Sequence, residues 1–521
     1  MTNQRKPRGK ILFDYVLEHA SETPQAQLAI FDDQVITYQG MVPKVYEYAK
    51  ALRASGVQQG DRIAHLGNPA PDFLVSYLAT GLVGAAWMGL NPKYSKRELE
   101  HVLVDAQPNM IFISEHLTEE DLEGIQIAKE VSRAELVNFS GTSNSRMTSL
   151  DEFFARAADV SVENWPKIQE RDAAIVVYTS GTTGAPKGAL LPHQAICYSG
   201  EQEAGKMNDM EGTQNENVRV INNLPINHVG CLVDICSPII VGGGCMVLME
   251  DFDTGKMLKV IENEKITIIG GVPTMLMMML ADPYFTKCDM SSVKRIIWSG
   301  AAMGEPMLQL FKAMGMELDT GYGLTETIGG VTTSCPDDDV HTLASTIGKP
   351  WDPDLLRLQN KKGEIITKPG VHGEIQVQGI STMIEYINRP DATKENFTED
   401  GWMHTGDIAE WTDNGYLKLV GRTKEMFKSG GYNVYPREIE AVLERFPGVA
   451  LAAVIPAKDE LFGEVGHAFI VPMFDLSVDK VKEWCKKELA NYKVPKTFTI
   501  SQELPILPIG KIDKKALAAQ L

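Results

Sequence analysis

The sequence predicts an α/β fold with a large N-terminal domain and a small α+β C-terminal domain. The large domain is expected to contain several subdomains, with parallel sheets and one β-rich region. Three observations lead to this prediction: short apolar runs alternate with amphipathic ones, strand patterns gather later in the chain, and a charged Gly-Gly segment separates the last hundred residues. A chain of 521 residues also fits about three structural units of ~150 residues each.

Buried strands followed by helices are predicted in the first part of the chain. The runs AAIVVYT (173–179), KITIIGG (265–271) and VKRIIWSG (293–300) are short, apolar and rich in β-branched residues. Each leads into a turn marked by Gly or Pro and then into a helical pattern. This alternation is typical of α/β layers whose sheets are largely parallel.

A change of pattern marks the later part of the chain. GEIQVQG (373–379) and GYLKLVGR (415–422) predict strands of a β-rich region. Beyond them, residues 436–446 predict a helix that begins with proline, 449–457 a strand, and 476–492 an amphipathic helix. The segment GRTKEMFKSGGYN (421–433) is the best boundary, so we expect domains at 1–423 and 424–521.

Composition excludes several classes of protein. The formal net charge of −19 argues against a general nucleic-acid binder, which needs a basic surface. The seven cysteines form no CxxC pair and no zinc-site spacing, which predicts reduced thiols in a cytoplasmic protein. No transmembrane segment is expected, because the most apolar run, 268–281, is too short to span a bilayer and contains proline. No signal peptide is expected at the N-terminus either. A homodimer is left open.

The strongest motif is the loop YTSGTTGAPKGA (178–189), which follows a predicted buried strand. Its glycines allow successive backbone N–H groups to point at one anion. Ser180, Thr182 and Thr183 add hydroxyl donors and Lys187 adds a cation, so the loop is suited to a triphosphate. It is not a Walker A loop, because Pro186 stands where that motif requires glycine.

This loop resembles the signature of the adenylate-forming superfamily, in its acyl-CoA synthetase branch. Further segments resemble the other motifs of that family, in the same order and spacing. They are GAAWMGLNPKYSKREL (84–99), LPINHVG (224–230), GYGLTET (321–327), WMHTGDIAEWTDNGYLKLVGR (402–422), GRTKEMFKSGGYNVYPREIE (421–440) and LPILPIGKIDKKAL (504–517). The resemblance covers nearly the whole chain.

The resemblance implies an ATP-dependent acid–thiol ligase that uses Mg²⁺ and coenzyme A. A carboxylate and ATP would give an acyl-adenylate and pyrophosphate, and CoA would then displace AMP to give an acyl-CoA. The implied catalytic residues are Lys511, Thr325, Glu326 and His228, with Glu326 also the metal ligand. The implied ATP-binding residues are Thr179, Ser180, Gly181, Thr182, Thr183, Gly184, Lys187, Gly300, Ala301, Ala302, Gly321, Tyr322, Gly323, Asp407 and Arg422.

Other roles follow from the same resemblance. Lys424 is the implied hinge about which the C-terminal domain rotates between the two half-reactions. The implied CoA-binding residues are Lys428, Ser429, Gly430 and Gly431. The implied acyl-pocket residues are His228, Val229, Trp298, Gly300 and Gly323.

The chemistry of four residues supports these roles. A carboxylate at Glu326 beside a triphosphate is understandable if Mg²⁺ lies between them. Asp407 can accept two charge-assisted hydrogen bonds from ribose hydroxyls. Lys511 can offset the repulsion between a carboxylate and the α-phosphate. Tyr322 offers a ring face for adenine.

Alternatives remain from sequence alone. An adenylation enzyme that loads a carrier protein is one, although no acidic residue stands in the NHVG stretch where such enzymes hold an amine. A non-catalytic relative would be expected to lack Lys511, Glu326 or Asp407, and an oxidative luciferase would use the same adenylate. The acid is expected to be of medium size and largely apolar, aliphatic or aryl.

Overall fold

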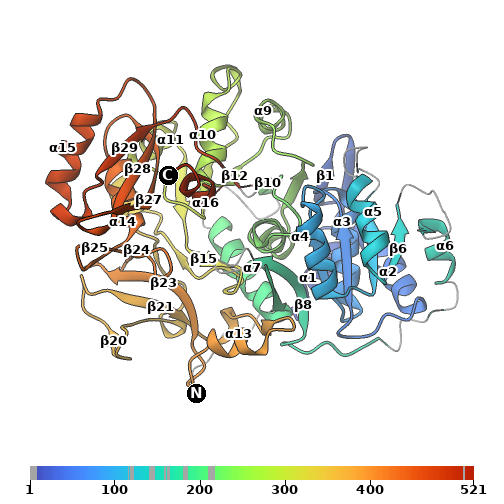
Figure 1. Cartoon of the computed structure of the whole chain (residues 1–521). Helices are drawn as coiled ribbons and strands as arrows, with labels where there is room; N and C mark the ends of the chain where they lie inside the picture. The colour runs from blue at the N-terminus through green and yellow to red at the C-terminus, as the bar shows by residue number, and fades with distance from the viewer. Residues whose placement is uncertain are drawn as a thin grey trace.

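The computed structural model describes residues 9–114, 117, 122–139, 147–157, 160, 165–179, 186–208, 217–507 and 511–521. Figure 1 shows the N-terminal elements, in blue, at the right, the C-terminal elements, in red, at the left, and the green elements between them. Within the described ranges, no helix combines the length and the apolar character needed to cross a membrane.

The first large sheet has seven strands in the order β14-β13-β12-β10-β11-β1-β2. All neighbouring pairs except β1 and β2 are parallel. The strands are β1 (Gln27–Phe31), β2 (Gln34–Thr37), β10 (Arg219–Asn222), β11 (Cys245–Leu248), β12 (Ile268–Gly271), β13 (Arg295–Trp298) and β14 (Glu317–Thr320).

The second large sheet has eight strands in the order β22-β9-β8-β4-β3-β5-β6-β7. It is parallel from β8 to β7, and β9 and β22 add antiparallel strands at one edge. The strands are β3 (Arg62–Leu66), β4 (Ala86–Leu90), β5 (Met110–Ile113), β6 (Glu135–Asn138), β7 (Thr148–Ser149), β8 (Ala173–Thr179), β9 (Lys187–Pro192) and β22 (Glu385–Tyr386).

Helices fill the space between the two sheets and cover their outer faces. One apolar cluster joins α1, α2, α3, α7 and α8 to strands of both sheets, so these helices form the central layer. A second cluster packs α9, α10 and α11 on the first sheet, and a third packs α4 and α5 on the second. The helices are α1 (Leu12–Glu22), α2 (Tyr38–Ala54), α3 (Pro71–Leu82), α4 (Lys96–Ala106), α5 (Leu122–Val131), α6 (Leu150–Ala155), α7 (His193–Asn208), α8 (Ser237–Gly242), α9 (Thr254–Asn263), α10 (Pro273–Ala281), α11 (Glu305–Ala313), α12 (Val340–Ser345) and α13 (Pro390–Glu395).

The predicted β-rich region is an antiparallel sheet of five strands in the order β20-β19-β21-β23-β24. Its strands are β19 (Leu356–Gln359), β20 (Ile365–Ile366), β21 (Gly373–Val377), β23 (Met403–Trp411) and β24 (Leu417–Arg422). Short paired strands lie beside it: β15 (Gly323–Leu324) with β16 (Gly329–Gly330), and β17 (Thr332–Thr333) with β18 (Lys349–Pro350).

The C-terminal part is a small α+β unit, drawn in red in Figure 1. Its sheet joins β25 (Phe427–Ser429), β26 (Tyr432–Val434), β27 (Val449–Asp459), β28 (Gly463–Pro472) and β29 (Thr497–Ile500). Three helices belong to it: α14 (Pro436–Glu444), α15 (Val478–Glu488) and α16 (Lys514–Ala518). It has its own apolar core, which packs α14 and α15 against the sheet.

The fold class predicted from the sequence is confirmed, with parallel sheets, a β-rich region and a separate C-terminal α+β unit. The strand expected at 173–179 has the predicted bounds, and the helix expected at 476–492 is shorter, Val478–Glu488. All seven cysteines are free thiols. The chain passes from β24 to β25 through a turn at 423–425, but the boundary at 423/424 stays a prediction.

Candidate active site

A buried aspartate, Asp407, lies on strand β23 of the β-rich sheet. Asp407 is 1% exposed, and burial raises the pKa of its carboxyl. Its two oxygens have different partners: Tyr322 Oη donates to Oδ2 at 2.6 Å, and Arg422 Nε lies 2.8 Å from Oδ1. Asp407 and Arg422 are register partners on β23 and β24, so the sheet itself aligns this pair.

Tyr322 has a more structural setting than its sequence motif indicated. Its ring is 8% exposed and belongs to the apolar core of the β-rich sheet. Its hydroxyl is held by Asp407. A ring face available to adenine therefore stays a prediction, whereas the hydrogen bond to Asp407 is a contact that the sequence did not reveal.

The phosphate loop lies between two paired strands. Thr179 ends β8 and Lys187 begins β9, and the two residues face each other in the antiparallel pair. The predicted donors between them, Ser180, Gly181, Thr182, Thr183 and Gly184, lie outside the described residues. The strands bring Lys187 to the base of this loop, with its Nζ 5.0 Å from the ring centroid of Tyr386.

Tyr386 joins the phosphate-loop strand to the predicted metal ligand. It pairs with Ala189 across β22 and β9, and its hydroxyl donates to Glu326 Oε1 at 2.7 Å. This leaves Oε2 of Glu326 for another ligand. The sequence analysis missed Tyr386, which lies 60 residues from Glu326 along the chain and belongs to none of the quoted motifs.

The motif that contains Glu326 is a tight hairpin. Gly323 and Gly330 are register partners in β15 and β16, and Thr325 O accepts from Ile328 N within the turn. A side chain at Gly323 would overlap the backbone of Gly329, and one at Gly321 would approach Thr332 O to 2.5 Å. Glycine is therefore required where the hairpin strands meet.

Lys511 reaches this region from the C-terminal unit. A Cβ built on Gly300 would lie 3.1 Å from Lys511 Cε and 3.8 Å from its Nζ. Burial, together with the nearby Arg422 guanidinium, lowers the pKa of the Lys511 ammonium, while Asp407, Asp234 and Glu326 oppose that change. The predicted ATP-binding residues Gly300, Ala301 and Ala302 form the turn after β13, at which the lysine arrives.

His228 stands beside the same lysine. Its Nδ1 accepts a hydrogen bond from Gly230 N at 3.0 Å. Burial lowers the pKa of the imidazole to about 4, and the charge of Lys511 acts in the same direction. His228 is therefore neutral near pH 7, and it lies two residues before the start of a helical turn at Gly230.

That turn, η3 (Gly230–Cys236), is a π-helix packed on one face of the first sheet. Ile297 of β13 packs on this face, beside its register partner Gly270 of β12. No atom lies within 4 Å of a Cβ built on Gly270, so there is open space at this point. We call the region bounded by η3, Gly270 and the β15–β16 hairpin the acyl site.

The structure corrects one predicted wall residue. Trp298 is 1% exposed and packs with Ile296 against α10 and α11, on the opposite face of the sheet from Ile297. Successive side chains of a strand point to opposite faces, and the sequence analysis assigned Trp298 to the wrong one. Val229 lies immediately before η3 and is 4% exposed.

Three charged residues at the acyl site escaped the sequence analysis. Asp234 lies on η3, and a side chain at Gly329 would overlap its Oδ1. Glu203 of α7 approaches the next residue of the hairpin, with Oε1 3.5 Å from a Cβ built on Gly330. Lys206 Nζ donates to that same Oε1 at 3.1 Å. The sequence signal that could have identified Asp234 is its position as the only acid in the apolar run GCLVDIC (230–236).

The predicted CoA-binding segment lies elsewhere in this arrangement. Lys428 and Ser429 belong to β25, and Gly430 and Gly431 form its turn to β26, with Gly430 N bonded to Phe462 O. Figure 1 places β25 at the outer side of the C-terminal unit, away from β15. In this structure, Lys511 therefore lies near Gly300, and the turn at Gly430 and Gly431 does not.

Lys424, the predicted hinge residue, is exposed in the turn between β24 and β25. Its neighbour Glu425 accepts from Lys514 Nζ at 2.8 Å, and Lys514 also lies 2.9 Å from Glu440 Oε1. These ion pairs tie the turn to the segment that carries Lys511. A rotation of the chain at Lys424 would thus move Lys511 together with the ion pairs of Lys514.

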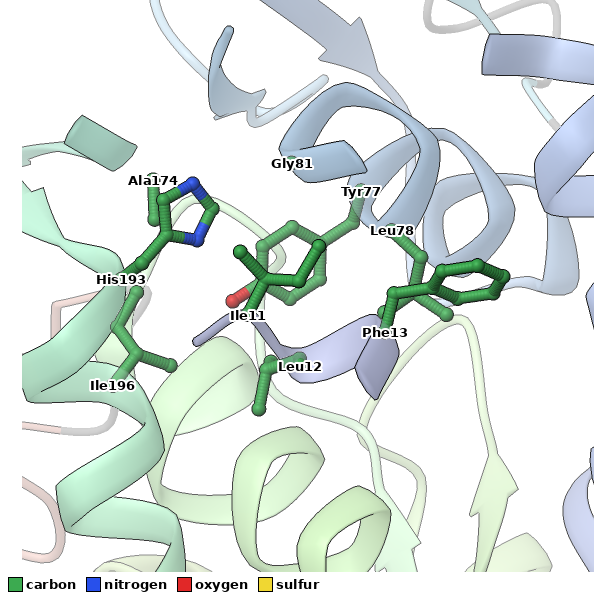
Figure 2. Close-up of a pocket in the computed structure, with 9 residues that line it drawn as sticks. All are labelled: Ile11, Leu12, Phe13, Tyr77, Leu78, Gly81, Ala174, His193 and Ile196. Carbon is green, nitrogen blue, oxygen red and sulfur yellow. The ribbon is translucent and has the colours of Figure 1, made fainter. Parts of the chain in front are cut away.

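A small cavity lined mostly by apolar side chains lies outside the acyl site. Figure 2 shows Tyr77 and His193 among apolar side chains of α1, α3 and α7. The cavity offers about 10 Å³, room for about one water molecule. Within the described residues, neither Tyr77 Oη nor His193 Nε2 has a hydrogen-bond partner.

The arrangement brings Lys511 within the influence of Asp407 and Glu326, and Tyr386 joins Glu326 to the phosphate-loop strand. Asp407 can accept from a sugar diol, Lys187 and the loop can face phosphates, and Lys511 can bridge two anions. Comparisons with known proteins agree with this chemistry. Residues 16–387 match the model of the AMP-binding enzyme family, and residues 438–511 match that of the AMP-binding enzyme C-terminal domain.

Characterised relatives extend over nearly the whole chain. The feruloyl-CoA synthase of an Amycolatopsis species is 33% identical over 513 residues, 97% of this chain and 98% of the relative. The indoleacetate–CoA ligase of Aromatoleum aromaticum is 31% identical over 505 residues, 96% of each chain.

Solved structures are similar as well. MatB of Rhodopseudomonas palustris, bound to ATP, has a TM-score of 0.82 at 27% identity over 98% of each chain. The o-succinylbenzoate CoA synthetase of Bacillus subtilis, in complex with its acyl-adenylate intermediate, has a TM-score of 0.78 at 27% identity, covering 96% of this chain and 97% of the other. The chain therefore belongs to the AMP-binding enzyme family and is an acyl-CoA synthetase, which ligates a carboxylic acid to CoA through an acyl-adenylate.

Proposed function

We propose that Lys511 is the catalytic cation of the first half-reaction and that the acyl site holds a small to medium carboxylic acid. The observation that carries this proposal is the position of Lys511 beside Gly300, within the influence of Asp407 and Glu326. In the first step, a carboxylate oxygen attacks the α-phosphorus of ATP. The bond from that phosphorus to the bridging oxygen breaks, and pyrophosphate leaves.

The residues of the site divide this work. Asp407 accepts from the ribose hydroxyls, and Arg422 and Tyr322 fix its two oxygens. Lys511 stabilises the negative charge that gathers where the two anions meet. His228, neutral and adjacent to Lys511, separates the acyl site from the nucleotide.

Glu326 fits a role as ligand to Mg²⁺. Within the described residues there is no group of three His, Cys, Asp or Glu side chains arranged for a metal. A single carboxylate suits Mg²⁺, which commonly takes one or two protein carboxylates, substrate phosphates and water. Mg²⁺, when bound, neutralises phosphate charge, and Tyr386 orients the carboxylate by holding its other oxygen.

The second half-reaction requires a different arrangement. We propose that the C-terminal unit rotates about Lys424, withdraws Lys511 and brings the turn at Gly430 and Gly431 to the site. The thiol of CoA loses its proton, its sulfur attacks the carbonyl carbon of the acyl-adenylate, and AMP leaves. The paired glycines give a narrow pantetheine arm close access to the backbone, which supports this assignment.

The acid is proposed to be aryl or aliphatic. The relatives named above are a feruloyl-CoA synthase and an indoleacetate–CoA ligase, so aryl acids are the first substrates to test. Transfer to a carrier protein is the competing final step. We also propose a cytoplasmic location, supported by seven free cysteines, and homodimer formation stays a prediction.

A screen of carboxylic acids tests the proposal. Each acid is incubated with ATP and Mg²⁺, and pyrophosphate release is measured before CoA or a carrier protein is added. Acid-dependent pyrophosphate release followed by acyl-CoA formation is expected. Pyrophosphate release with transfer to the carrier alone would favour the competing final step, and ADP formation would contradict both.

A further inference from the structure

Asp234 is a carboxylate without a partner inside the acyl site. Within the described residues it makes no hydrogen bond and no ion pair, although it stands on a π-helix whose other residues are buried and apolar. Its Oδ1 faces Gly329, where φ is +77° and a side chain would overlap the carboxylate. The hairpin of the GYGLTET motif therefore leaves room specifically for Asp234.

The charges around Asp234 do not neutralise it. Glu203 already pairs with Lys206, whose Nζ also lies 4.7 Å from the ring centroid of Trp351. Both side chains are mostly buried, 18% and 21% exposed. The charge of Lys511 lowers the pKa of Asp234, but in the proposed function this lysine bridges the two reacting anions. Asp234 is partly exposed, but a bound acid would cover it and remove its water, and a buried carboxylate without a partner is costly, so a ligand group is the natural partner.

Resting on the proposed function, we infer that the acid activated by this enzyme carries an O–H or N–H donor at the end remote from its carboxylate, and that Asp234 accepts from it. The substrate would then span the acyl site, with its carboxylate at Lys511 and its donor at Asp234. A purely hydrocarbon tail would leave Asp234 desolvated and unpaired. A site built to accept a hydrogen bond discriminates strongly against the analogue that lacks the donor.

Matched acids test this inference. ATP–pyrophosphate exchange is measured with pairs that differ only in the remote group: 4-hydroxycinnamate with cinnamate, 3-(4-hydroxyphenyl)propanoate with 3-phenylpropanoate, and 6-hydroxyhexanoate and 6-aminohexanoate with hexanoate. In the best pair, the donor acid should exceed its partner at least tenfold in kcat/KM. Asp234→Ala should reduce that ratio below threefold, while kcat/KM for the donor-free acid stays equal or rises.

Control variants distinguish a failure of the inference about Asp234 from a failure of the proposed function. Asp289→Ala removes an exposed aspartate paired with Lys265 and should leave the ratio unchanged. Melting curves and ATP binding establish that Asp234→Ala is folded, and Asp234→Asn provides a second variant of nearly equal shape. A parent enzyme that prefers the donor-free acids, or a ratio that survives both Asp234 variants, overturns the inference but leaves the proposed function intact. Absence of exchange with every acid would count against the proposed function itself.

Discussion

Asp407 and Arg422 occupy opposite positions on the antiparallel strands β23 and β24, and Arg422 Nε lies 2.8 Å from Asp407 Oδ1. Backbone pairing thus fixes a charge pair next to the predicted ribose site. The hydroxyl of Tyr322 fixes the second carboxylate oxygen. The proposed ribose acceptor is therefore held in one orientation by protein groups alone.

Removal of the Asp407 carboxylate should weaken ATP binding. Losing a hydrogen bond to a charged group typically costs ~1.5–3 kcal/mol, so Asp407→Ala should raise the Michaelis constant for ATP about 10- to 100-fold. The measurement is the ATP dependence of pyrophosphate release. Asp400→Ala is the matched control, since Asp400 pairs with Arg357 on the exposed side of the same region. Equal constants for Asp407→Ala and the parent would exclude the ribose role.

Lys511→Ala should separate the two half-reactions. The first step needs a cation between carboxylate and α-phosphate, so acyl-adenylate formation should fall by at least a factor of 10³, a size typical of lost transition-state stabilisation. Thioester formation from supplied acyl-adenylate should be retained within a few fold. Lys515→Ala changes an exposed lysine four residues later and serves as control. Equal loss in both steps would contradict the assignment.

Glu326→Gln should raise the Mg²⁺ concentration needed for pyrophosphate release, because the ligand keeps its shape and loses its charge. Tyr386→Phe removes the hydroxyl that holds Oε1 and should produce a smaller shift in the same direction. A Mg²⁺ titration of the three proteins orders the effects. Superimposable curves for Glu326→Gln and the parent would leave Glu326 without a metal role.

A pH profile tests the state of Asp234. Burial, with the repulsion of Glu203, raises the pKa of this carboxyl to about 7, against the charges of Lys206 and Lys511. Because kcat/KM reports the free enzyme, its value for 6-aminohexanoate should increase from pH 6 to pH 8 as Asp234 loses its proton. The remote amine stays protonated over this range. Asp234→Asn should abolish the increase, and an unchanged profile in that variant would rule out Asp234 as its source.

Lys424→Pro should block the proposed rotation of the C-terminal unit. Proline fixes φ near −65°, and the described structure shows no hydrogen bond from the Lys424 amide that the substitution would remove. Pyrophosphate release should persist while acyl-CoA formation falls at least 100-fold. Lys424→Ala should keep both steps, and a melting curve controls for folding. A folded proline variant that makes acyl-CoA at the parent rate would place the hinge elsewhere.

Local patterns predicted much of this fold. The strand at 173–179 is apolar and bounded by turn residues, so its limits were readable from the sequence. The charged Gly-Gly segment was predicted as a domain boundary, and it contains the β24–β25 and β25–β26 turns. The predicted helix at 476–492 was too long because amphipathic residues continue past Glu488, the last residue of α15.

Long-range contacts were beyond these patterns. Tyr386 reaches Glu326 only because β22 joins the phosphate-loop strand, and nothing in its local sequence marks that pairing. Trp298 was misplaced because a four-residue buried strand does not reveal which face meets the acyl site. The lack of a partner for Asp234 could be recognised only from the packing of η3 against the β15–β16 hairpin.

Transfer of labelled oxygen tests the acyl-adenylate most directly. The enzyme is supplied with a carboxylic acid labelled with ¹⁸O in both carboxylate oxygens, together with ATP, Mg²⁺ and CoA, and the products are analysed by mass spectrometry. Because a carboxylate oxygen attacks the α-phosphorus and stays on it when the thioester forms, one ¹⁸O atom should appear in each AMP. Unlabelled AMP, or label in inorganic phosphate accompanied by ADP, would contradict the account.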